Sequence, residues 1–314
     1  MDTSRPLKIA IVGAGAVGAY YGCLLARAGH DVHFLLRSDL ETVRRDGYHI
    51  TTPDTQFHLF PVNAHADTAE IGPCDLVIIA LKATANAAFP ALLPPLNDPA
   101  RGTVFLTLQN GMGNVESLAR LFPAENVLGG VCFVCINRLA SGVVRSFIPG
   151  QIHLADSDGP ARPRTHALAA VFAAAGAICK VVDSLDRALW FKLCWNIPFN
   201  SLAILGGGIT TDLIIASPAL HELVEALMHE VQAAAAAYGV EIPDKHITTQ
   251  FQTIGAMGAY KPSSLIDFQE KRPVEVEAIL GEPLRRGLAK GVSMGRLACV
   301  YALMRHQFAA HQRD

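Results

Sequence analysis

Residues 7–36 read LKIAIVGAGAVGAYYGCLLARAGHDVHFLL, and this stretch decides the fold. Its first part, Leu7–Val12, is an almost unbroken apolar run, as in a parallel strand that is covered on both faces. A glycine-rich turn and an apolar, helix-like run follow, and the helix-like run ends at Gly29. Asp31–Leu36 then has the composition of a second strand. Strand, turn, helix and strand within about thirty residues predict a βαβ unit.

Three glycines in the turn, Gly13, Gly15 and Gly18, have the spacing GxGxxG. In a βαβ unit this spacing is the fingerprint of a dinucleotide-binding fold. The first glycine permits the tight turn, the second lets the backbone approach a pyrophosphate, and the third allows close helix–strand packing. The N–H groups at the start of the helix would face the phosphates. We therefore predict a nucleotide site here; the alternative is a turn that is merely rich in glycine.

The same stretch has a second interpretation. Arg5 and Lys8 precede an uncharged run from residue 9 to residue 26, as in a signal peptide or a membrane span. Glycines and tyrosines interrupt the run, so we predict a buried strand and a buried helix instead. Seven scattered cysteines, an odd number, are typical of reduced thiols. We expect a soluble, cytoplasmic protein with no membrane contact.

Strand-like and helix-like segments alternate as far as residue 183. Further strands are expected at Asp75–Ala80, Thr103–Leu108, Val127–Ile136 and Ile178–Val182, and helices at Thr84–Leu93, Gly113–Leu121 and Arg164–Ala175. Val143–Leu154 is broken by Pro149-Gly150, which predicts an antiparallel hairpin. This alternation predicts an α/β fold with a Rossmann-type, doubly wound sheet over residues 1–183.

From residue 184 onward the strand-like runs disappear, and an all-helical second domain is predicted over residues 184–314. Its helices are expected at Leu185–Leu205, Pro218–Tyr238, Lys245–Gly255 and Pro273–Arg286. Pro218 suits the first turn of a helix, with Ser217 as the capping residue.

The composition excludes several classes of protein. The 314 residues are enough for two domains, and 51% hydrophobic against 17% charged residues excludes a disordered chain. With 26 basic and 28 acidic side chains the net charge is −2, so there is no basic excess for nucleic acid. The apolar helical half suggests a homodimer, which sedimentation would decide.

No metal site is predicted. Cys132 and Cys135 have CxxC spacing, but no second pair and no nearby histidine completes four zinc ligands. The twelve histidines include no HExxH motif or other compact ligand set.

The end of the second strand, Leu36-Arg37-Ser38-Asp39, should select the cofactor. NAD enzymes place an acidic residue near this position for the ribose 2′-OH. Arg37 can instead pair with a 2′-phosphate, and Ser38 can hydrogen-bond it, which favours NADP(H). The alternatives are that Arg37 is a solvated surface charge or that Asp39 takes its guanidinium.

Lys192 lies in the apolar run LWFKLCWN, a poor place for an ammonium without a task. Desolvation there would lower its pKa towards the range useful for proton transfer. On a helix, Lys192, Asn196 and Asn200 follow one another in i+4 steps and span an arc of roughly 80°. In a purely structural alternative, Lys192 snorkels and the two asparagines brace the helix.

Several separate motifs share one order and spacing with a known family. They are GAGAVG at 13–18, Leu81-Lys82-Ala83, Gln109-Asn110-Gly111, Trp190-Phe191-Lys192-Leu193, Asn196 to Asn200, Ser263-Ser264 and Arg272-Pro273-Val274-Glu275. On these motifs the chain resembles the ketopantoate reductase (2-dehydropantoate 2-reductase) family over almost its whole length. The resemblance implies reduction of a small 2-oxo acid with NADPH.

The resemblance also implies roles for individual residues. Lys192 would be the general acid, and Asn196 and Asn200 would help to hold the substrate. Glu275 would lie near the substrate's oxygens as the second catalytic residue. Ser264 would bind the substrate's carboxylate.

Lys82 and Asn110 match residues at the cofactor–substrate junction of the family. The motif residues of the second domain also have structural alternatives. Glu275 could be an exposed first-turn glutamate behind Pro273, and Ser264 could be part of a helix cap.

The chain departs from the family near the expected substrate pocket. Family members commonly have Ser-Ser-Met-x-Gln-Asp where this chain has Ser-Ser-Leu-Ile-Asp at 263–267, one residue shorter. Two alternatives to ketopantoate reduction therefore stay open. One is a paralogous enzyme for another 2-oxo or hydroxy acid, and the other is a non-catalytic NADP(H)-binding sensor.

Overall fold

The computed structural model describes residues 2–311, which form two compact units. Of the described residues, the first unit holds those up to Gln109 and Asn114–Leu185. The second holds Asn110–Gly113 and the described residues from Asp186 onward. A four-residue loop from the first half of the chain therefore counts with the second unit, which the sequence alone does not indicate.

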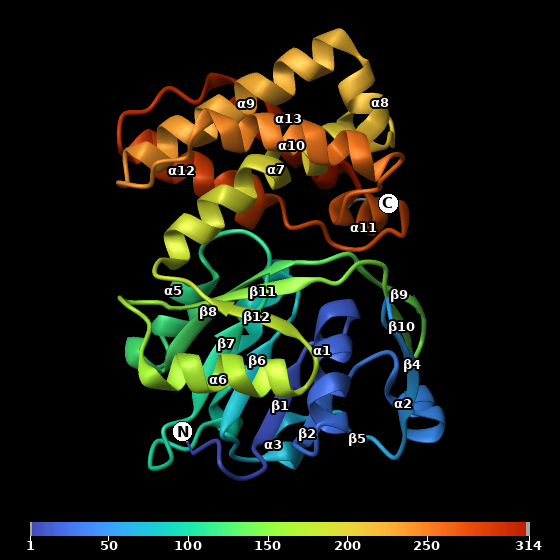
Figure 1. Cartoon of the computed structure of the whole chain (residues 1–314). Coiled ribbons are helices and arrows are strands. Elements are labelled where there is room, and N and C mark those ends of the chain that lie inside the picture. Colours follow the sequence, from blue (N-terminus) through green and yellow to red (C-terminus); the bar gives the residue numbers. More distant parts are fainter. Residues whose placement is uncertain (1, 312–314) are drawn as a thin grey trace. The chain divides into compact units, whose positions relative to one another are not determined.

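An eight-stranded sheet forms the centre of the first unit (Figure 1), in the order β12-β11-β8-β7-β6-β1-β2-β5. In that order the strands are Ile178–Val181, Gln151–Asp156, Val127–Phe133, Val104–Thr107, Leu76–Ile79, Lys8–Val12, Asp31–Leu35 and Asn63–His65. Paired neighbours are parallel except β8 and β11, which are antiparallel. The order runs outward in both directions from β1, so the predicted doubly wound sheet is confirmed.

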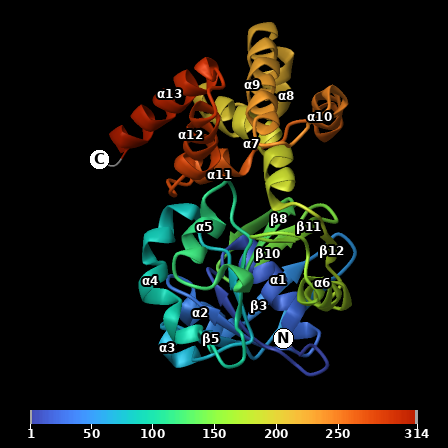
Figure 2. The ribbon, with the colours of Figure 1, turned by 90° about the vertical axis from the view of Figure 1, so that its left-hand side faces the viewer.

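Helices cover both faces of this sheet. Figure 2 shows α3, α4 and α5 on one side and α6 on the other. The helices α1, α3, α4, α5 and α6 are Ala16–Arg27, Thr68–Ile71, Phe89–Leu92, Asn114–Ala119 and Pro163–Ala174. Ile9 and Ile11 of β1 belong to the core with α1 and α6, whereas Ala10 and Val12 belong to the core with α4 and α5. Alternate side chains of the strand are thus buried on opposite faces, as its unbroken apolar sequence predicts.

A second, four-stranded sheet covers the other side of α1. Its order is β4-β3-β10-β9, with bounds Gln56–Leu59, Tyr48–Thr51, Val143–Ser146 and Ile136–Ala140. Tyr48, Ile50 and Val144 of this sheet share one core with α1. All residues of α1 from 18 to 25 are buried, because a sheet packs on either side of it. The run that resembles a signal peptide is therefore a strand, a turn and a helix without a polar face.

The predicted hairpin over Val143–Leu154 is wrong. β10 pairs with β9 and β3, whereas β11 pairs with β8 and β12 of the larger sheet. The strand expected at Val127–Ile136 also divides, into β8 and the start of β9. At both places the chain passes from one sheet to the other, a tertiary choice that local alternation does not reveal.

Shorter elements complete the first unit. They are α2 (Leu40–Asp46) and the 3₁₀ turns η1 (Ala83–Ala88), η2 (Pro94–Leu96) and η3 (Ala124–Asn126).

The described residues of the second unit contain helices and no strand, as predicted. The helices α7 to α13 are Leu185–Leu205, Thr211–Ala216, Pro218–Ala236, Asp244–Met257, Ser263–Gln269, Glu282–Ala289 and Gly295–His311, and η4 (Glu277–Gly281) is a π-helical turn. Trp190 and Phe199 of α7 lie in the apolar core of the second unit. Ser217 precedes α9 as expected, but its side chain makes no capping hydrogen bond.

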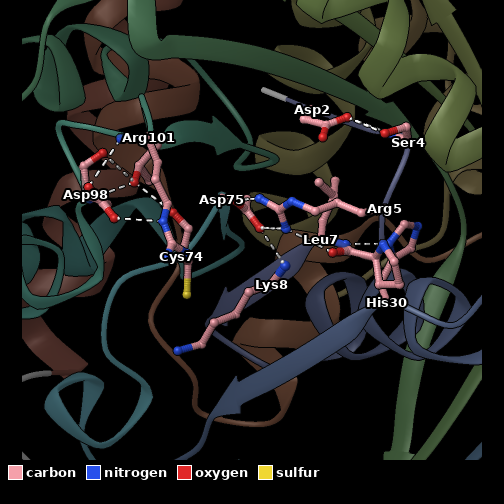
Figure 3. A network of polar contacts seen from close by, with 12 residues as sticks. Asp2, Ser4, Arg5, Leu7, Lys8, His30, Cys74, Asp75, Asp98 and Arg101 are labelled. Atoms are coloured by element: carbon pink, nitrogen blue, oxygen red, sulfur yellow. Dashed lines mark hydrogen bonds and ion pairs between the residues drawn. The ribbon is translucent and has the colours of Figure 1, made fainter.

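Arg5 and Asp75 fasten β1 to the start of β6 (Figure 3). Arg5 Nη1 and Nη2 donate to the two carboxylate oxygens of Asp75 at 3.0 and 2.7 Å. The backbone N–H of Lys8 donates to the same carboxylate at 2.9 Å. The Arg5 guanidinium holds the pKa of Asp75 below its usual range, and the Lys8 N–H acts in the same direction.

We expect Asp75→Asn to lower the free energy of unfolding at pH 7 by about 1–2 kcal/mol, because Arg5 is half exposed and solvent weakens the pair. Asp75 has a lowered pKa in the folded chain, so its contribution is present above about pH 4 and is lost as pH falls through the folded pKa. Urea unfolding at pH 7 and pH 3 measures this, with Asp54→Asn, at an exposed aspartate of a surface turn, as control. Equal losses at both pH values would contradict the ion pair.

Candidate active site

The carboxyl ends of four parallel strands lie in register at one edge of the large sheet. The register pairs Val12 with Leu35, Val12 with Ile79, and Ile79 with Thr107. Gly13, Arg37 and Lys82 follow the first three of these strand ends. Ligands of open α/β sheets bind at this edge, so the residues predicted for the cofactor lie where the fold places a ligand.

The glycine turn is shaped by two close contacts. Gly13 has φ +99°, and a Cβ atom there would lie 2.4 Å from the backbone N of Leu81. A Cβ atom on Gly18 would lie 2.2 Å from the carbonyl oxygen of Gly13. Both positions therefore exclude any side chain, as the fingerprint predicts.

Gly15 differs, because a Cβ atom there would meet nothing within 4 Å. Packing within the protein does not require glycine at this position. Gly15 is the N-cap of α1, and the first turn of α1 holds no acidic residue. Open space beside uncapped helical N–H groups fits the pyrophosphate of a dinucleotide.

Arg37 is exposed and makes no hydrogen bond or ion pair with the described residues. Asp39 is buried and does not take the Arg37 guanidinium, which was the alternative raised by the sequence. Its carboxylate instead accepts hydrogen bonds from Ser38 Oγ, at 3.1 Å, and from Arg138 Nη1. Lys82 is half-buried and forms the N-cap of η1.

In the second unit, α7 runs without a break from Leu185 to Leu205, through Pro198. Lys192, Asn196 and Asn200 therefore lie along one side of the same helix. Lys192 is half-buried, and Asn196 and Asn200 are 6% and 2% exposed. The side-chain amide of Asn196 makes no hydrogen bond with the described residues. Asn196 is largely buried as a residue, but its amide is not among the enclosed polar atoms that lack a partner, so the amide is open to a polar ligand.

Lys192 and Asn110 are in direct contact. Lys192 Nζ donates a hydrogen bond of 2.6 Å to Asn110 Oδ1. Asn110 belongs to the loop Asn110–Gly113, which counts with the helical unit. The lysine does not simply extend into solvent, because this hydrogen bond fixes the direction of its ammonium group.

The loop that carries Asn110 is attached to the helical unit through backbone. The N–H of Met112 donates to the carbonyl oxygen of Ala278 at 2.9 Å. Gly111 has φ +80°, and a Cβ atom there would lie 2.3 Å from the same oxygen. Glycine is required at this position by conformation and by space.

The carbonyl group of Ala278 can accept this bond because of the local helix type. In η4 the N–H of Glu282 donates five residues back, to Glu277. The same pattern would give Ala278 a donor at position 283, but Pro283 has no N–H. The proline therefore leaves the Ala278 oxygen without a helical partner, and Met112 uses it.

The two ends of the loop are joined in the first unit. Asn86 Oδ1 accepts from Gln109 Nε2 at 2.8 Å, and Asn86 Nδ2 donates to Asn114 Oδ1 at 2.9 Å. Thr107 Oγ1 in turn donates to Gln109 Oε1 at 2.9 Å. The sequence gives no signal for Asn86, because the relation is between side chains far apart in the chain.

Asn200 and Ser264 are also brought together. The N–H of Ser264 donates to Asn200 Oδ1 at 3.0 Å, and Asn200 Nδ2 donates to the carbonyl oxygen of Asn196 at 3.0 Å. Asn200 thus braces α7 against the start of α11, as the structural alternative supposed. Neither Ser263 nor Ser264 is the N-cap of α11, a position that Pro262 occupies.

Glu275 is 4% exposed and precedes the helical turn η4, so it is not an exposed first-turn glutamate. The helix expected from Pro273 begins later than predicted. The neighbouring Glu277 is exposed and bonds Arg285 and Tyr301 instead.

Metal-binding clusters and membrane-spanning helices are both absent from the described part of the chain. No group of three or more His, Cys, Asp or Glu is arranged to hold a metal ion. No helix within residues 2–311 has the length and apolarity needed to cross a bilayer.

The doubly wound sheet and the glycine turn have the form of a dinucleotide-binding fold, and the comparisons name the family. A family profile described as "Ketopantoate reductase PanE/ApbA" matches residues 9–159, and its C-terminal counterpart matches residues 184–308. The chain belongs to the ketopantoate reductase family.

Relatives and solved structures agree with this placement. A 2-dehydropantoate 2-reductase of Nostoc is 40% identical, over 94% of this chain and 93% of the relative. The crystal structure of 2-dehydropantoate 2-reductase from Geobacter metallireducens is 44% identical, with TM-score 0.93 over 96% of this chain and 100% of that one. A D-mandelate dehydrogenase at 21% identity, with TM-score 0.83 over 97% of this chain and 99% of that one, shares the fold.

We expect Gly111→Ala to destabilise the chain by more than about 2 kcal/mol, because it combines left-handed strain with a contact on Ala278. Gly291→Ala is the matched control, since Gly291 has φ +74° and open space around it. The control should lose only the conformational part, about 1 kcal/mol. Thermal unfolding of both variants measures the difference. Equal losses would show that the loop does not press on Ala278.

Proposed function

We propose that this chain reduces 2-dehydropantoate (ketopantoate) to pantoate with NADPH, with Lys192 as the general acid. The observation that carries the proposal is the 2.6 Å hydrogen bond between Lys192 Nζ and Asn110 Oδ1. It gives a fixed direction to the ammonium group of a lysine that lies among apolar neighbours. The family and the names of its members supply the substrate.

The chemistry requires a proton donor at the substrate's carbonyl oxygen. NADPH, when bound, supplies the hydride that adds to the carbonyl carbon. The oxygen then carries the negative charge of an alkoxide, and Lys192 transfers a proton from Nζ to it, which yields the hydroxy acid. Asn110 holds the ammonium group in place, so no reorientation is needed when the charge develops.

The substrate residues have different roles in this proposal. Asn196 offers an amide that is bonded to none of the described residues and is open to solvent, which suits the polar groups of a small 2-oxo acid. Glu275 is buried in the same unit and is proposed as the carboxylate near the substrate's oxygens. Ser264 is proposed to bind the substrate's carboxylate, and Asn200 acts through it by holding its backbone N–H.

The residues present fit the cofactor. The space beside Gly15 and the N–H groups of α1 suit a pyrophosphate. Arg37 is exposed after β2. The acidic side chain that follows Ser38, Asp39, is already bonded to Arg138. This supports NADP(H) rather than NAD(H), with Lys82 as a further contact at the same sheet edge.

A second candidate is a paralogous enzyme acting on another small 2-oxo or hydroxy acid. The shortened stretch at 263–267 favours it, because this stretch contains Ser264. The occurrence of a D-mandelate dehydrogenase on the same fold shows that the fold does not determine the substrate. A non-catalytic sensor is disfavoured, since it would not need the Lys192–Asn110 pair.

The test of the proposal is the consumption of NADPH with ketopantoate, repeated with NADH and with a panel of other 2-oxo acids. We expect turnover to be fastest with ketopantoate and NADPH. Faster turnover of another 2-oxo acid would replace the substrate and leave the reaction class intact. Cofactor binding without turnover of any 2-oxo acid would refute the enzyme and favour the non-catalytic sensor.

We expect Lys192→Ala to lower kcat about 100-fold or more, because the alkoxide loses its proton donor. The affinity for NADPH, measured by fluorescence titration, should stay the same. Lys245→Ala, at an exposed lysine of the same unit, is the control and should behave like the unaltered chain. A Lys192→Ala variant with unchanged kcat would refute the assignment.

A further inference from the structure

Asp39 occupies a position that could oppose the use of NADP(H). It follows Arg37 by two residues, in the turn between β2 and α2, where it is the N-cap of α2, and it is buried. A carboxylate near this position binds the ribose hydroxyls in NAD enzymes. The same carboxylate repels the charge of a 2′-phosphate. Left to itself, Asp39 would therefore favour NAD(H).

The structure engages both oxygens of this carboxylate. Oδ1 accepts from Ser38 Oγ at 3.1 Å, and Oδ2 accepts from Arg138 Nη1. The Asp39 side chain is 10% exposed, and the Arg138 side chain is 34% exposed. Because the carboxylate is buried, a guanidinium in contact with it neutralises it more effectively than it would a fully exposed carboxylate, although Arg138 itself is partly open to water.

Arg138 comes from a distant part of the chain. It lies in β9 of the smaller sheet, opposite Val144 of β10. Asp39 is its only ion-pair partner among the described residues. The Arg138 guanidinium thus reaches Asp39 from the smaller sheet. The glycine fingerprint does not include such an arginine.

We propose that Arg138 determines the cofactor specificity of this chain by occupying and neutralising Asp39. Asp39 then neither accepts ribose hydroxyls nor repels a 2′-phosphate, and Arg37 keeps its full charge for the phosphate. This inference rests on the proposed use of NADP(H) and adds a residue that acts through Asp39. Arg138 is thus a positioning residue for specificity.

The test measures binding without turnover, by calorimetry with 2′,5′-ADP and 5′-AMP. These probes differ in the 2′-phosphate alone. We expect Arg138→Gln to weaken 2′,5′-ADP about tenfold, because the carboxylate becomes an uncompensated charge. Binding of 5′-AMP should stay the same or become tighter. The double variant Asp39→Asn/Arg138→Gln should recover 2′,5′-ADP binding, because no charge is left to repel the phosphate.

Two controls define the scale. Arg37→Gln should weaken 2′,5′-ADP binding, because Arg37 is the proposed contact of the phosphate. Arg145→Gln removes an exposed arginine from β10, whose guanidinium lies over the Phe147 ring, and should change neither probe.

Several outcomes would overturn the inference. Equal weakening of both probes by Arg138→Gln would indicate a structural role alone. Selective weakening that the double variant does not repair would mean that Arg138 itself contacts the phosphate. If the unaltered chain binds 2′,5′-ADP no more tightly than 5′-AMP, the proposed use of NADP(H) is refuted as well. This measurement precedes any variant, so the two failures can be told apart.

Discussion

The close contact of α1 with β1 is the constraint on which the first unit depends. The helix is buried along residues 18–25 because the larger sheet packs on one side and the smaller sheet on the other. Gly18 lies against the carbonyl group of Gly13, and a Cβ atom on Gly22 would lie 2.5 Å from the Phe34 ring. Side chains at these positions would move the helix away from the strand. The N–H groups at the uncapped N-terminus of α1 would then no longer lie beside the glycine turn, where a phosphate would meet them.

A second constraint concerns the loop of residues 110–113. Asn86 connects the residues on either side of it, while Met112 and Asn110 are bound to Ala278 and Lys192. Each contact is modest by itself, but together they leave the Asn110 side chain little freedom. A proton donor whose partner is held in this way is arranged before the substrate arrives.

Much of this organisation can be predicted from the sequence, and the remainder has physical reasons. The βαβ start, the helical second half and the i+4 series on α7 follow from local periodicity. The passage of the chain between two sheets at residues 133–136 and 146–151 does not, because strand pairing is decided by tertiary packing. Pro283 removes the helical N–H that would bond the Ala278 oxygen, yet the donor that takes this oxygen, the N–H of Met112, lies 166 positions before Ala278 in the chain. Arg138 and Asn86 gave no signal.

The assignment of residues 110–113 to the helical unit has a consequence for protein engineering. The two halves of the sequence look like modules that could be recombined at a single junction near residue 185. A chimera made at that junction would combine a foreign helical half with this chain's own Asn110–Gly113 loop. The foreign helices would then face a loop whose partners in this chain are the Ala278 carbonyl group and Lys192. A functional exchange of halves therefore needs two junctions, with the small loop transferred together with its helices.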